Sequence, residues 1–360
     1  MPTRQKPGST VRIKDVALRA RVSSGTVSHV LTGHARVSET LRARVQKAID
    51  ALGYVPNFHA QGLRHSRSRV VGICLPHAST AYLNTLSQTL EEIASAAGYG
   101  VMHVFSRHDS AIELDRIRDL VRYGVDGLVL LPSLSPANAL EMAARKNVPL
   151  VIVDRPIADR RFDQVTLDNR AGMREVTERL VALGHRRLLF VCHSQGRLAT
   201  RHRLQALAAV CAKSPHASFR TIEHHDDTEF LRDELARELQ QPPHATAWVV
   251  SNSHQAYIVL GYLAERGVRC PEDVSVLAFD DPEWSTLVRP RLSVVRQLAR
   301  AMAHAAWDLL LQRINGSDQA PQTVALGATV ELRASVTAPH AKPGVVALMR
   351  GAGPLGPGRR

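Results

Sequence analysis

Short apolar stripes at helical spacing run through the first part of the chain. Over residues 13–20, apolar side chains recur at i, i+3, i+4 and i+7, which predicts an amphipathic helix. Ser23 can cap a second helix over 24–31, and Ser38 can cap a third over 39–52. Because only a few residues separate the first two helices, the pattern predicts a helix-turn-helix.

From Val70 onward, short apolar runs alternate with amphipathic stretches. We expect strands over residues 70–75, 100–105, 127–131, 149–154, 188–192, 247–251 and 274–279. We expect helices over residues 83–97, 112–123, 137–146, 170–183, 201–212, 229–240, 255–266 and 298–313. Wholly apolar strands that alternate with helices predict parallel sheets covered on both faces. The units are too many for one modest sheet, so we expect two lobes.

Composition and charge add a first functional inference. The chain has 360 residues, 44% of them hydrophobic, which suits a small domain and a larger one with real cores. Residues 1–69 hold thirteen Lys or Arg and three acids, so this segment carries ten of the thirteen net positive charges. A basic module on a near-neutral body is typical of a polyanion binder. A solvated basic surface or an anionic membrane would also fit the charge, but the apolar faces here are needed for a three-helix core.

The cysteines and the N-terminal segment indicate the compartment. Cys74, Cys192, Cys211 and Cys270 are scattered without a C-x-x-C pair, as is usual for reduced thiols in a cytosolic protein. The first residues lack the apolar run of a signal peptide, and no stretch reaches transmembrane length. We therefore expect a cytoplasmic protein without a membrane partner.

Five separated motifs then indicate a family. They are Asp15-Val16-Ala17, VSSGTVSHVL at 22–31, Val37-Ser38, GYVPN at 53–57 and an A-x-x-L pattern at 60–63. In this order and spacing they resemble the headpiece of the LacI–GalR (lactose/purine repressor) family. The resemblance implies an N-terminal all-α helix-turn-helix headpiece, followed by an α/β periplasmic-binding-protein-like effector domain of two doubly wound lobes.

The second helix is expected to contact DNA. Ser24, Gly25, Ser28 and His29 are small or polar side chains on its exposed face, and such side chains can approach base edges in a major groove. An ordinary helical hairpin would show the same pattern, and the family resemblance is what favours DNA binding. The expected DNA-binding residues are Lys14, Ser23, Ser24, Gly25, Ser28, His29, Thr32, Arg36, Tyr54, Asn57, Ala60 and Leu63.

The segment 57–69 is polar and basic, with the single leucine Leu63. In the family, the hinge helices of two subunits pair in the minor groove and the matching leucine wedges between base pairs, so the resemblance implies that Leu63 kinks the operator. The residues alone favour a flexible linker whose leucine packs on the adjoining domain.

Two headpiece positions depart from the family pattern. Arg21 stands where the turn residue is usually glycine, so it is strained if its φ is positive. His29 stands where arginine is common, and an imidazole reads guanine less firmly than a bidentate guanidinium. We therefore expect a different operator preference at that position.

The effector site is expected just after the strands of the body, where parallel α/β sheets bind ligands. By resemblance, Arg201, Asn252 and Asp280 match effector-contacting positions, and Asp154 and Gln297 are further candidates. The expected effector-binding residues are His77, Asp154, Arg155, Arg201, Asn252, Asp280 and Gln297. Carboxylates, amides and guanidinium groups suit polyhydroxylated ligands. Each of these residues could instead be a helix cap or a salt bridge between lobes.

Ligand identity does not carry over from the family. HASTAY at 77–82 replaces an aromatic-rich segment common in relatives, and Asn252-Ser253 replaces a common Asn-Asp. His77, Arg107, Arg155 and Arg201 would make the cleft electropositive. This favours an acidic effector, such as a sugar acid or a phosphorylated sugar.

We divide the chain into a headpiece (1–56), a hinge (57–69), an effector-binding and dimerisation domain (70–338) and a basic tail (339–360). The Gly/Pro-rich composition of the tail predicts disorder. The family chain crosses between its lobes three times, and we place these crossings near 154–168, 280–291 and 325–331. Because a twofold operator requires two headpieces and the tetramerising leucine heptads are absent, we expect a homodimer.

Catalytic patterns are missing from the sequence. No G-x-S-x-G, Walker A, H-E-x-x-H or G-x-G-x-x-G motif follows a strand. Asp280 and Asp281 are neighbours on an extended chain and should point oppositely, so we do not expect them to share a proton. The run His224 to Asp227 fits a solvated turn better than a metal site. We expect no enzymatic activity, no metal and no cofactor.

The sequence therefore predicts a sequence-specific DNA-binding transcriptional regulator of the repressor type. Its expected partners are a palindromic operator on double-stranded DNA and a small-molecule effector, which is a sugar, a sugar acid or a phosphorylated sugar. The alternative is a sugar-binding receptor with a non-functional headpiece, which would bind small molecules without salt-sensitive DNA binding. An enzyme on a doubly wound fold would need a catalytic constellation.

Overall fold

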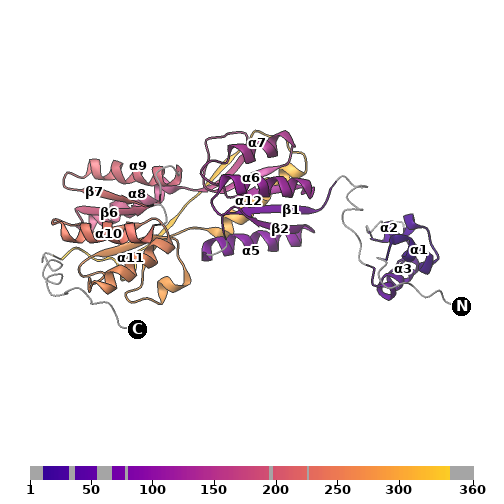
Figure 1. The fold of residues 1–360 in the computed structure, drawn as a ribbon, viewed down its shortest axis with the longest axis horizontal. Helices are drawn as coiled ribbons and strands as arrows, with labels where there is room; N and C mark the ends of the chain where they lie inside the picture. Colours follow the sequence, from indigo (N-terminus) through magenta and orange to yellow (C-terminus); the bar gives the residue numbers. More distant parts are fainter. Residues whose placement is uncertain are drawn as a thin grey trace. The chain divides into compact units, whose positions relative to one another are not determined.

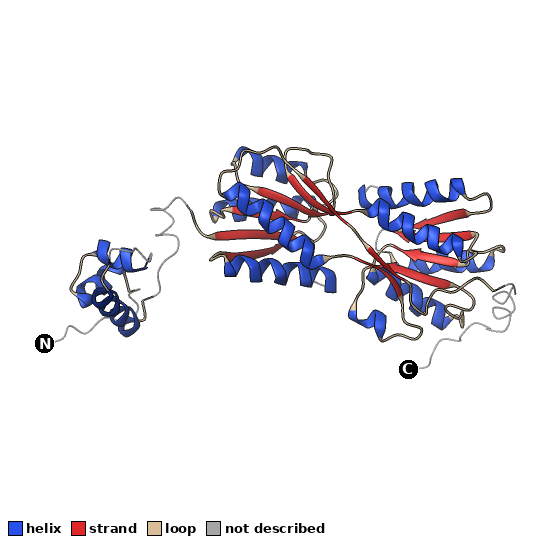
Figure 2. Cartoon of the chain, turned by 180° about the vertical axis from the view of Figure 1, so that it is seen from behind, coloured by secondary structure: helices blue, strands red, loops and turns tan. Residues whose placement is uncertain are grey.

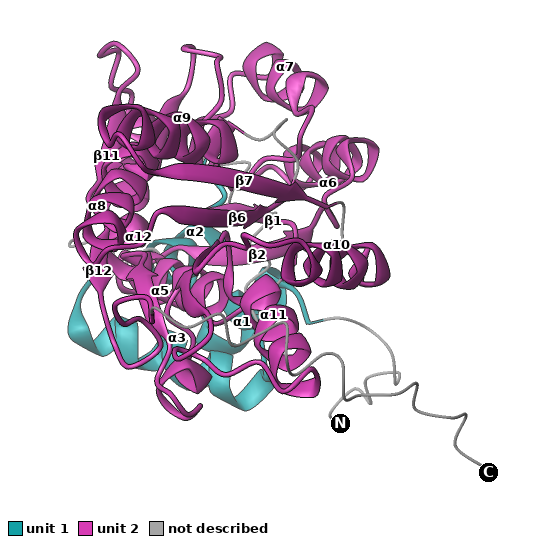
Figure 3. Ribbon diagram, turned by 90° about the vertical axis from the view of Figure 1, so that its left-hand side faces the viewer, with its two compact units in different colours: residues 1–68 teal, residues 69–360 magenta. Residues whose placement is uncertain are grey.

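The computed structural model describes residues 11–31, 37–54, 67–77, 80–193, 198–224 and 227–340. The chain forms two compact units, Met1–Ser68 and Arg69–Arg360, which are coloured separately in Figure 3. Each unit has its own hydrophobic core. The helices and strands are labelled in Figure 1.

The first unit is a small helical domain. Its described elements are α1 (Ile13–Ala20), α2 (Ser24–Leu31) and α3 (Glu39–Leu52). The apolar faces of all three helices meet in one core, with Val16, Val27 and Val45 fully buried. The predicted helix-turn-helix and third helix are therefore confirmed.

The turn between α1 and α2 explains where these two helices end and begin. Arg21 has a φ of 51°, in the left-handed region, and its backbone N–H donates to the carbonyl of Leu18 (3.2 Å). A side chain in this conformation has a steric cost that glycine avoids, so the strain expected at Arg21 is present. The Oγ of Ser23 accepts a hydrogen bond from the backbone N–H of Thr26 (3.0 Å), which forms the predicted cap of α2.

The second unit contains two lobes, each built on a six-stranded sheet (Figure 1). Lobe 1 has the strand order β11-β5-β4-β3-β1-β2. Its strands are β1 (Val70–Leu75), β2 (Gly100–Phe105), β3 (Gly127–Leu130), β4 (Leu150–Asp154), β5 (Asp163–Leu167) and β11 (Thr323–Leu326). One face of the sheet packs on α5 (Ala81–Ala96) and α12 (Ala299–Ile314), and the other packs on α6 (Ser110–Arg122) and α7 (Ala137–Arg145).

Lobe 2 repeats this arrangement, with the order β12-β10-β9-β8-β6-β7. Its strands are β6 (Arg187–Cys192), β7 (Ser218–Glu223), β8 (Ala247–Val250), β9 (Ser275–Phe279), β10 (Ser293–Arg296) and β12 (Thr329–Glu331). Its helices are α8 (Asn169–Ala182) and α9 (Leu198–Lys213) on one face, α10 (Thr228–Gln240) and α11 (Ser253–Glu265) on the other, and the short η1 (Glu283–Thr286). The paired strands are parallel except β12, which is antiparallel to β10. The predicted fold class is therefore confirmed.

Three chain crossings join the lobes (Figure 2). The first lies at Asp168, between β5 and α8, at the end of the predicted stretch 154–168. The third, between β11 and β12, lies inside the predicted stretch 325–331. The second prediction, near 280–291, was wrong. The chain stays in lobe 2 there because β10 pairs with β9, and it crosses only at 297–298 on the way to α12.

Two further sequence predictions can be compared with the structure. All four cysteines are free thiols. Burial raises the pKa of Cys74 and of Cys192 to about 12, so neither thiol is a ready nucleophile. Within the part of the chain that the structure describes, no helix is long and apolar enough to span a bilayer.

Candidate functional site

A cleft of about 1220 Å³ lies between the two lobes of the second unit. Residues that follow the carboxyl ends of the parallel strands line both of its walls. They include His77 after β1, Pro132 after β3, Arg155 after β4, His193 after β6, Ser251 after β8 and Asp280 after β9. All seven predicted effector-binding residues line this cleft. Which of them contact a ligand stays a prediction.

Asp280 is the most buried carboxylate in the cleft, with 9% of its surface exposed. It follows β9 with a φ of 74°, a left-handed conformation that aspartate tolerates. Its Oδ2 accepts from the backbone N–H of Ser253 (3.3 Å), and its Oδ1 accepts from the Nε2 of Gln297. Burial raises the pKa of Asp280, while the hydrogen bond from Gln297 acts in the opposite direction.

Gln297 leaves an acceptor in the same region. Its Oε1 is buried and has no hydrogen-bond partner within the described structure. An unsatisfied buried carbonyl is costly, so this oxygen is well suited to accept from a ligand hydroxyl.

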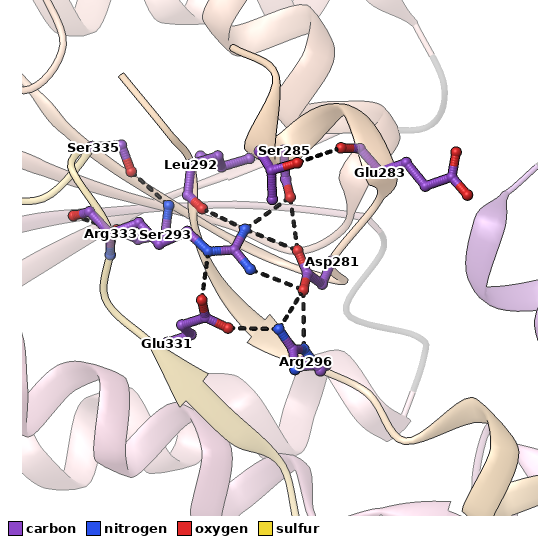
Figure 4. Close-up of polar contacts among 10 residues, drawn as sticks. Asp281, Glu283, Ser285, Leu292, Ser293, Arg296, Glu331, Arg333 and Ser335 are labelled. Carbon is purple, nitrogen blue, oxygen red and sulfur yellow. Dashed lines mark hydrogen bonds and ion pairs between the residues drawn. The ribbon is translucent and has the colours of Figure 1, made fainter. Parts of the chain in front are cut away.

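Asp281, next to Asp280, belongs to a different set of contacts (Figure 4). Its Oδ1 accepts from the Oγ of Ser285 (2.7 Å) and from Nη1 of Arg333 (2.9 Å). Its Oδ2 accepts from Nη2 of Arg333 (2.9 Å) and Nε of Arg296 (2.9 Å). Burial raises its pKa, but these hydrogen bonds outweigh burial and the net shift is downward. The prediction that Asp280 and Asp281 do not share a proton agrees with this geometry.

Arg203 is a buried cation that sequence analysis missed. Its Nε donates to Oδ1 of Asn169 (2.7 Å), its Nη1 donates to the carbonyl of Ser251 (2.8 Å), and its guanidinium lies 3.6 Å from the ring centroid of Phe279. Burial lowers the pKa of Arg203 to about 10, so the group stays charged at neutral pH.

The predicted Arg201 also lines the cleft but is exposed. The signal that distinguishes the two was present in the sequence. Arg203 falls on the apolar stripe of α9 with Leu207 and Val210, whereas Arg201 does not.

Asp154 ends β4 with a φ of 66° and is half-buried. Its Oδ1 accepts from the Oη of Tyr82 (3.1 Å), and Tyr82 also contacts the Sδ of Met302 (3.0 Å). Burial, followed by the charges of Asp154 and Asp280, raises the pKa of Tyr82 well above its ordinary value. Tyr82 is a second cleft residue that the sequence did not identify.

His77, His108 and Arg155 form a cluster on the lobe 1 wall. The rings of His77 and His108 meet edge to face with centroids 5.1 Å apart. Nη1 of Arg155 lies 3.2 Å from Nδ1 of His108 and donates to the carbonyl of Pro132 (3.1 Å). His77 and Arg155 were predicted, and His108 was not.

Asn252 also has a structural role. Its side chain caps α11 by accepting from the backbone N–H of Gln255 (2.8 Å). The helix-cap alternative therefore describes one of its functions, although the residue also lines the cleft.

In the first unit, the structure describes seven of the twelve predicted DNA-binding residues. Lys14, Ser23 and His29 are exposed, and Ser24, Gly25, Ser28 and Tyr54 are partly so. Thr32, Arg36, Asn57, Ala60 and Leu63 lie outside the described residues.

A metal site is not evident among the described residues, which include no group of three or more His, Cys, Asp or Glu that could hold an ion. In the run His224 to Asp227, His224 is buried rather than solvated, and its Nε2 lies 2.6 Å from Nε2 of Gln255. His225 and Asp226 lie outside the described residues.

Comparison with protein families matches both units. Residues 12–57 match the bacterial regulatory proteins of the lacI family. Residues 177–336 match a periplasmic binding protein-like domain.

Two known regulators are similar to nearly the whole chain. The chain is 26% identical to the HTH-type transcriptional regulator KdgR of Bacillus subtilis, over 92% of this chain and 100% of that protein. It is 28% identical to the HTH-type transcriptional regulator GalR of Escherichia coli, over 91% of this chain and 96% of that protein.

Solved structures have the same fold. The transcriptional regulator CelR in complex with cellobiose matches with a TM-score of 0.68 and 25% identity, over 91% of this chain and 100% of that one. The Lac repressor dimer bound to operator and an anti-inducer matches with a TM-score of 0.81 and 24% identity, over 92% of this chain and 100% of that one. With its helix-turn-helix unit and its two-lobed α/β unit, the chain belongs to the lacI family of bacterial transcriptional regulators.

Proposed function

We propose that this regulator acts in the cytoplasm as a homodimer that represses from a palindromic operator, and that a polyhydroxylated small molecule in the cleft controls it. The observation that carries the proposal is the cleft itself, where polar groups from both lobes converge on one space. Asp154 comes from lobe 1, Asp280 and Arg203 come from lobe 2, and Gln297 lies on the crossing between them.

The chemistry of these groups suits hydroxyl groups. A sugar hydroxyl both donates and accepts, so it pairs well with a carboxylate on one side and a guanidinium on the other. The buried Oε1 of Gln297 adds an acceptor that needs a donor. The relative CelR was solved in complex with cellobiose, which supports a sugar-class ligand for this fold.

The size of the cleft supports a conformational role for the ligand. Its volume of about 1220 Å³ exceeds the usual range for ligand pockets, about 300–1,000 Å³. An approach of the two lobes would increase the contacts that a sugar-sized molecule makes with both walls. The ligand would therefore favour the closed arrangement by its differential contacts with it.

The DNA contacts are proposed for the exposed face of α2, with Ser24, Ser28 and His29 toward base edges and Lys14 toward phosphate. A dimer would place two such helices on two half-sites, and the Lac repressor dimer bound to operator is a precedent in this fold. Leu63 is proposed as the minor-groove wedge of the hinge. The coupling between cleft and operator would be about 1–3 kcal/mol, or about 5- to 150-fold in operator affinity.

The experiment is selection of DNA sites from a random pool by the full-length protein at physiological salt. We expect a palindrome with a flexible central step, and an affinity that falls steeply with salt because many phosphate contacts are made. The variant Leu63→Ala should weaken binding to the selected site and spare binding to random DNA. Sequence-blind binding by the wild type would favour a receptor with a non-functional headpiece.

A further inference from the structure

We propose that the effector carries an acidic group, a carboxylate or a phosphate, which binds to the basic cluster His77, His108 and Arg155 on the lobe 1 wall. This inference rests on the proposed function of the cleft as the effector site. In this proposal, lobe 1 recognises the acidic end of the ligand and lobe 2 recognises its hydroxyl groups.

The sheet brings the three residues together from distant parts of the chain. His77 follows β1, His108 follows β2 and Arg155 follows β4, and these strands lie in the order β4-β3-β1-β2. The edge-to-face contact of the two imidazoles and the 3.2 Å approach of Arg155 to His108 make one continuous surface. All three residues line the cleft.

The backbone directs His108 into the cleft. Arg107 and His108 both have left-handed conformations, with φ of 54° and 62°. Two consecutive side chains in this region turn the chain sharply after β2, and histidine tolerates this conformation better than most residues. Arg107 is exposed, whereas His108 lines the cleft.

The hydrogen bonds give the cluster the character of a donor surface. A guanidinium can only donate, so Nδ1 of His108 accepts from Arg155 and Nε2 of His108 carries the proton. A surface with a permanent cation and imidazole N–H groups is complementary to an acceptor with negative charge. A planar carboxylate or a phosphate fits a guanidinium especially well.

Three carboxylates of lobe 1 have donors of their own. Glu113 is fully buried and accepts from the backbone N–H (2.6 Å) and Oγ (2.9 Å) of Ser133. Asp154 accepts from Tyr82, and Asp159 binds Arg161 through both of its carboxylate oxygens. Each of these carboxylates therefore has a hydrogen-bond donor other than Arg155.

The opposite wall has a different character, which sets the orientation of the ligand. Arg201 and Arg203 also line the cleft, and the charges of Asp280 and Asp154 both act on the buried Arg203. When Asp280, Gln297 and Arg203 contact the hydroxyl groups of the ligand, its acidic end faces the cluster on lobe 1. An acidic polyol would bridge the two lobes, whereas its neutral counterpart would engage chiefly lobe 2.

The experiment measures binding of matched ligand pairs to the full-length protein by calorimetry, at constant pH and ionic strength. The pairs are an aldonate and its alditol, a uronate and its parent aldose, and an aldose phosphate and the same aldose. We expect one acidic member to bind at least about tenfold tighter than its neutral partner, as for a gain of charge-assisted hydrogen bonds. The pair that responds separates carboxylate from phosphate.

Variants assign that preference to the cluster. Arg155→Gln should remove most of the acid preference and leave the affinity of the neutral partner within about twofold, whereas Arg155→Lys should keep part of it because the charge remains. Arg145→Gln is the matched control, since Arg145 is exposed on α7 of the same lobe and pairs with Glu141. This variant should leave the affinities of the acidic and the neutral ligand unchanged.

Three results would overturn the proposal: equal binding of acidic and neutral partners, an acid preference that survives Arg155→Gln, or no binding of any acidic member. Release of the operator by a neutral sugar would overturn it too, while leaving the proposed regulation by the cleft intact. Binding of an acid through Arg155 without any effect on the operator would support the anion site and contradict the proposed coupling.

Discussion

The two lobes of the second unit have the same strand order, so each position in one sheet has a counterpart in the other. β4 and β9 are counterparts, and they lead to Asp154 and Asp280, both left-handed and both lining the cleft. In each case one residue and then a proline follow, Arg155-Pro156 in lobe 1 and Asp281-Pro282 in lobe 2.

The lobes differ in what that intervening residue does. Arg155 lines the cleft, whereas Asp281 is held by Arg333, Arg296 and Ser285 beside the crossings (Figure 4). The same backbone turn is thus followed by a cleft-lining side chain in lobe 1 and by a side chain that braces neighbouring segments in lobe 2. In a fold with two equivalent lobes, one side-chain difference can place a residue in the cleft in one lobe and in a structural contact in the other.

The largest expected effect on stability is that of replacing Arg203, the buried cation of lobe 2. Arg203→Met should destabilise the second unit by about 3–5 kcal/mol, because it leaves buried carboxylates without a counter-charge and two acceptors without a donor. The measurement is urea unfolding of the full-length protein. Arg201→Met, two residues earlier on α9 and exposed, should stay within about 0.5 kcal/mol. Equal losses in the two variants would contradict the distinction drawn between these arginines.

A direct comparison of the two counterpart positions should give the next largest effect. Asp281→Asn should cost about 1.5–3 kcal/mol of unfolding free energy, since Arg333, only 8% exposed, loses one of its two charged acceptors and keeps Glu331. Arg155→Gln should cost well under half as much and change ligand affinity instead. If Arg155→Gln proves the more destabilising, the proposed division between recognition and bracing is wrong.

The pH dependence of stability should also separate the lobes. His185, fully buried in lobe 2, donates from Nε2 to the carbonyl of Thr337 (2.9 Å), and its Nδ1 lies 2.9 Å from the hydroxyl of Thr246, which can donate to Nδ1 when the ring is neutral. Burial lowers its pKa from 6.5, so between the two pKa values the unfolded state binds more protons than the folded state. Stability should therefore fall as the pH drops below about 6.5 and through the folded pKa, by at most about 1.4 kcal/mol per pH unit.

The variant His185→Gln should flatten this dependence, as measured by urea midpoints between pH 7 and 5. His103 in lobe 1 is the control, because burial lowers its pKa as well but the side chain is exposed. His103→Gln should leave most of the pH dependence in place. The opposite ranking would contradict the assignment to His185.

The smallest expected effect on stability is that of replacing Arg21, the left-handed residue between α1 and α2 in the first unit. Arg21→Gly should stabilise that unit by up to about 1 kcal/mol, because glycine adopts this φ without strain but adds entropy to the unfolded state. Hydrogen exchange of the amides in α1 to α3 gives the measurement. Gly53→Ala, at a φ of 59°, should do the reverse. A loss of stability in Arg21→Gly would show that the arginine side chain makes a compensating contact.

The elements with a clear hydrophobic period could be predicted from the sequence. β1 and β2 match the predicted ranges, and the helices match within a few residues. No range was predicted for β5, β7, β10, β11 or β12. The last three have only three or four residues, which give no readable alternation, and overlooking β10 misplaced the second crossing.

For the cleft, residues that directly follow apolar strands could be found, such as His77 and Asp280. His108 could not, because it reaches the cleft only through two left-handed residues after β2. Tyr82 could not either, because its contact with Asp154 joins positions 72 residues apart. Arg203 was predictable from its place on the buried stripe of α9.

The second crossing has a consequence for the order in which the molecule can be made. It returns the chain to lobe 1 as α12, where Leu310 and Ile314 pack so tightly on β3 that a Cβ at Gly127 would lie 2.8 Å from Leu310 Cδ1. One face of the first sheet is therefore covered only by α5 until the ribosome has released residues beyond 314. At about 5–20 residues per second, α12 is synthesised about 10–50 s after the headpiece, so lobe 1 must wait for nearly the whole chain. A nascent polypeptide of this kind could complete its helix-turn-helix unit before its cleft exists.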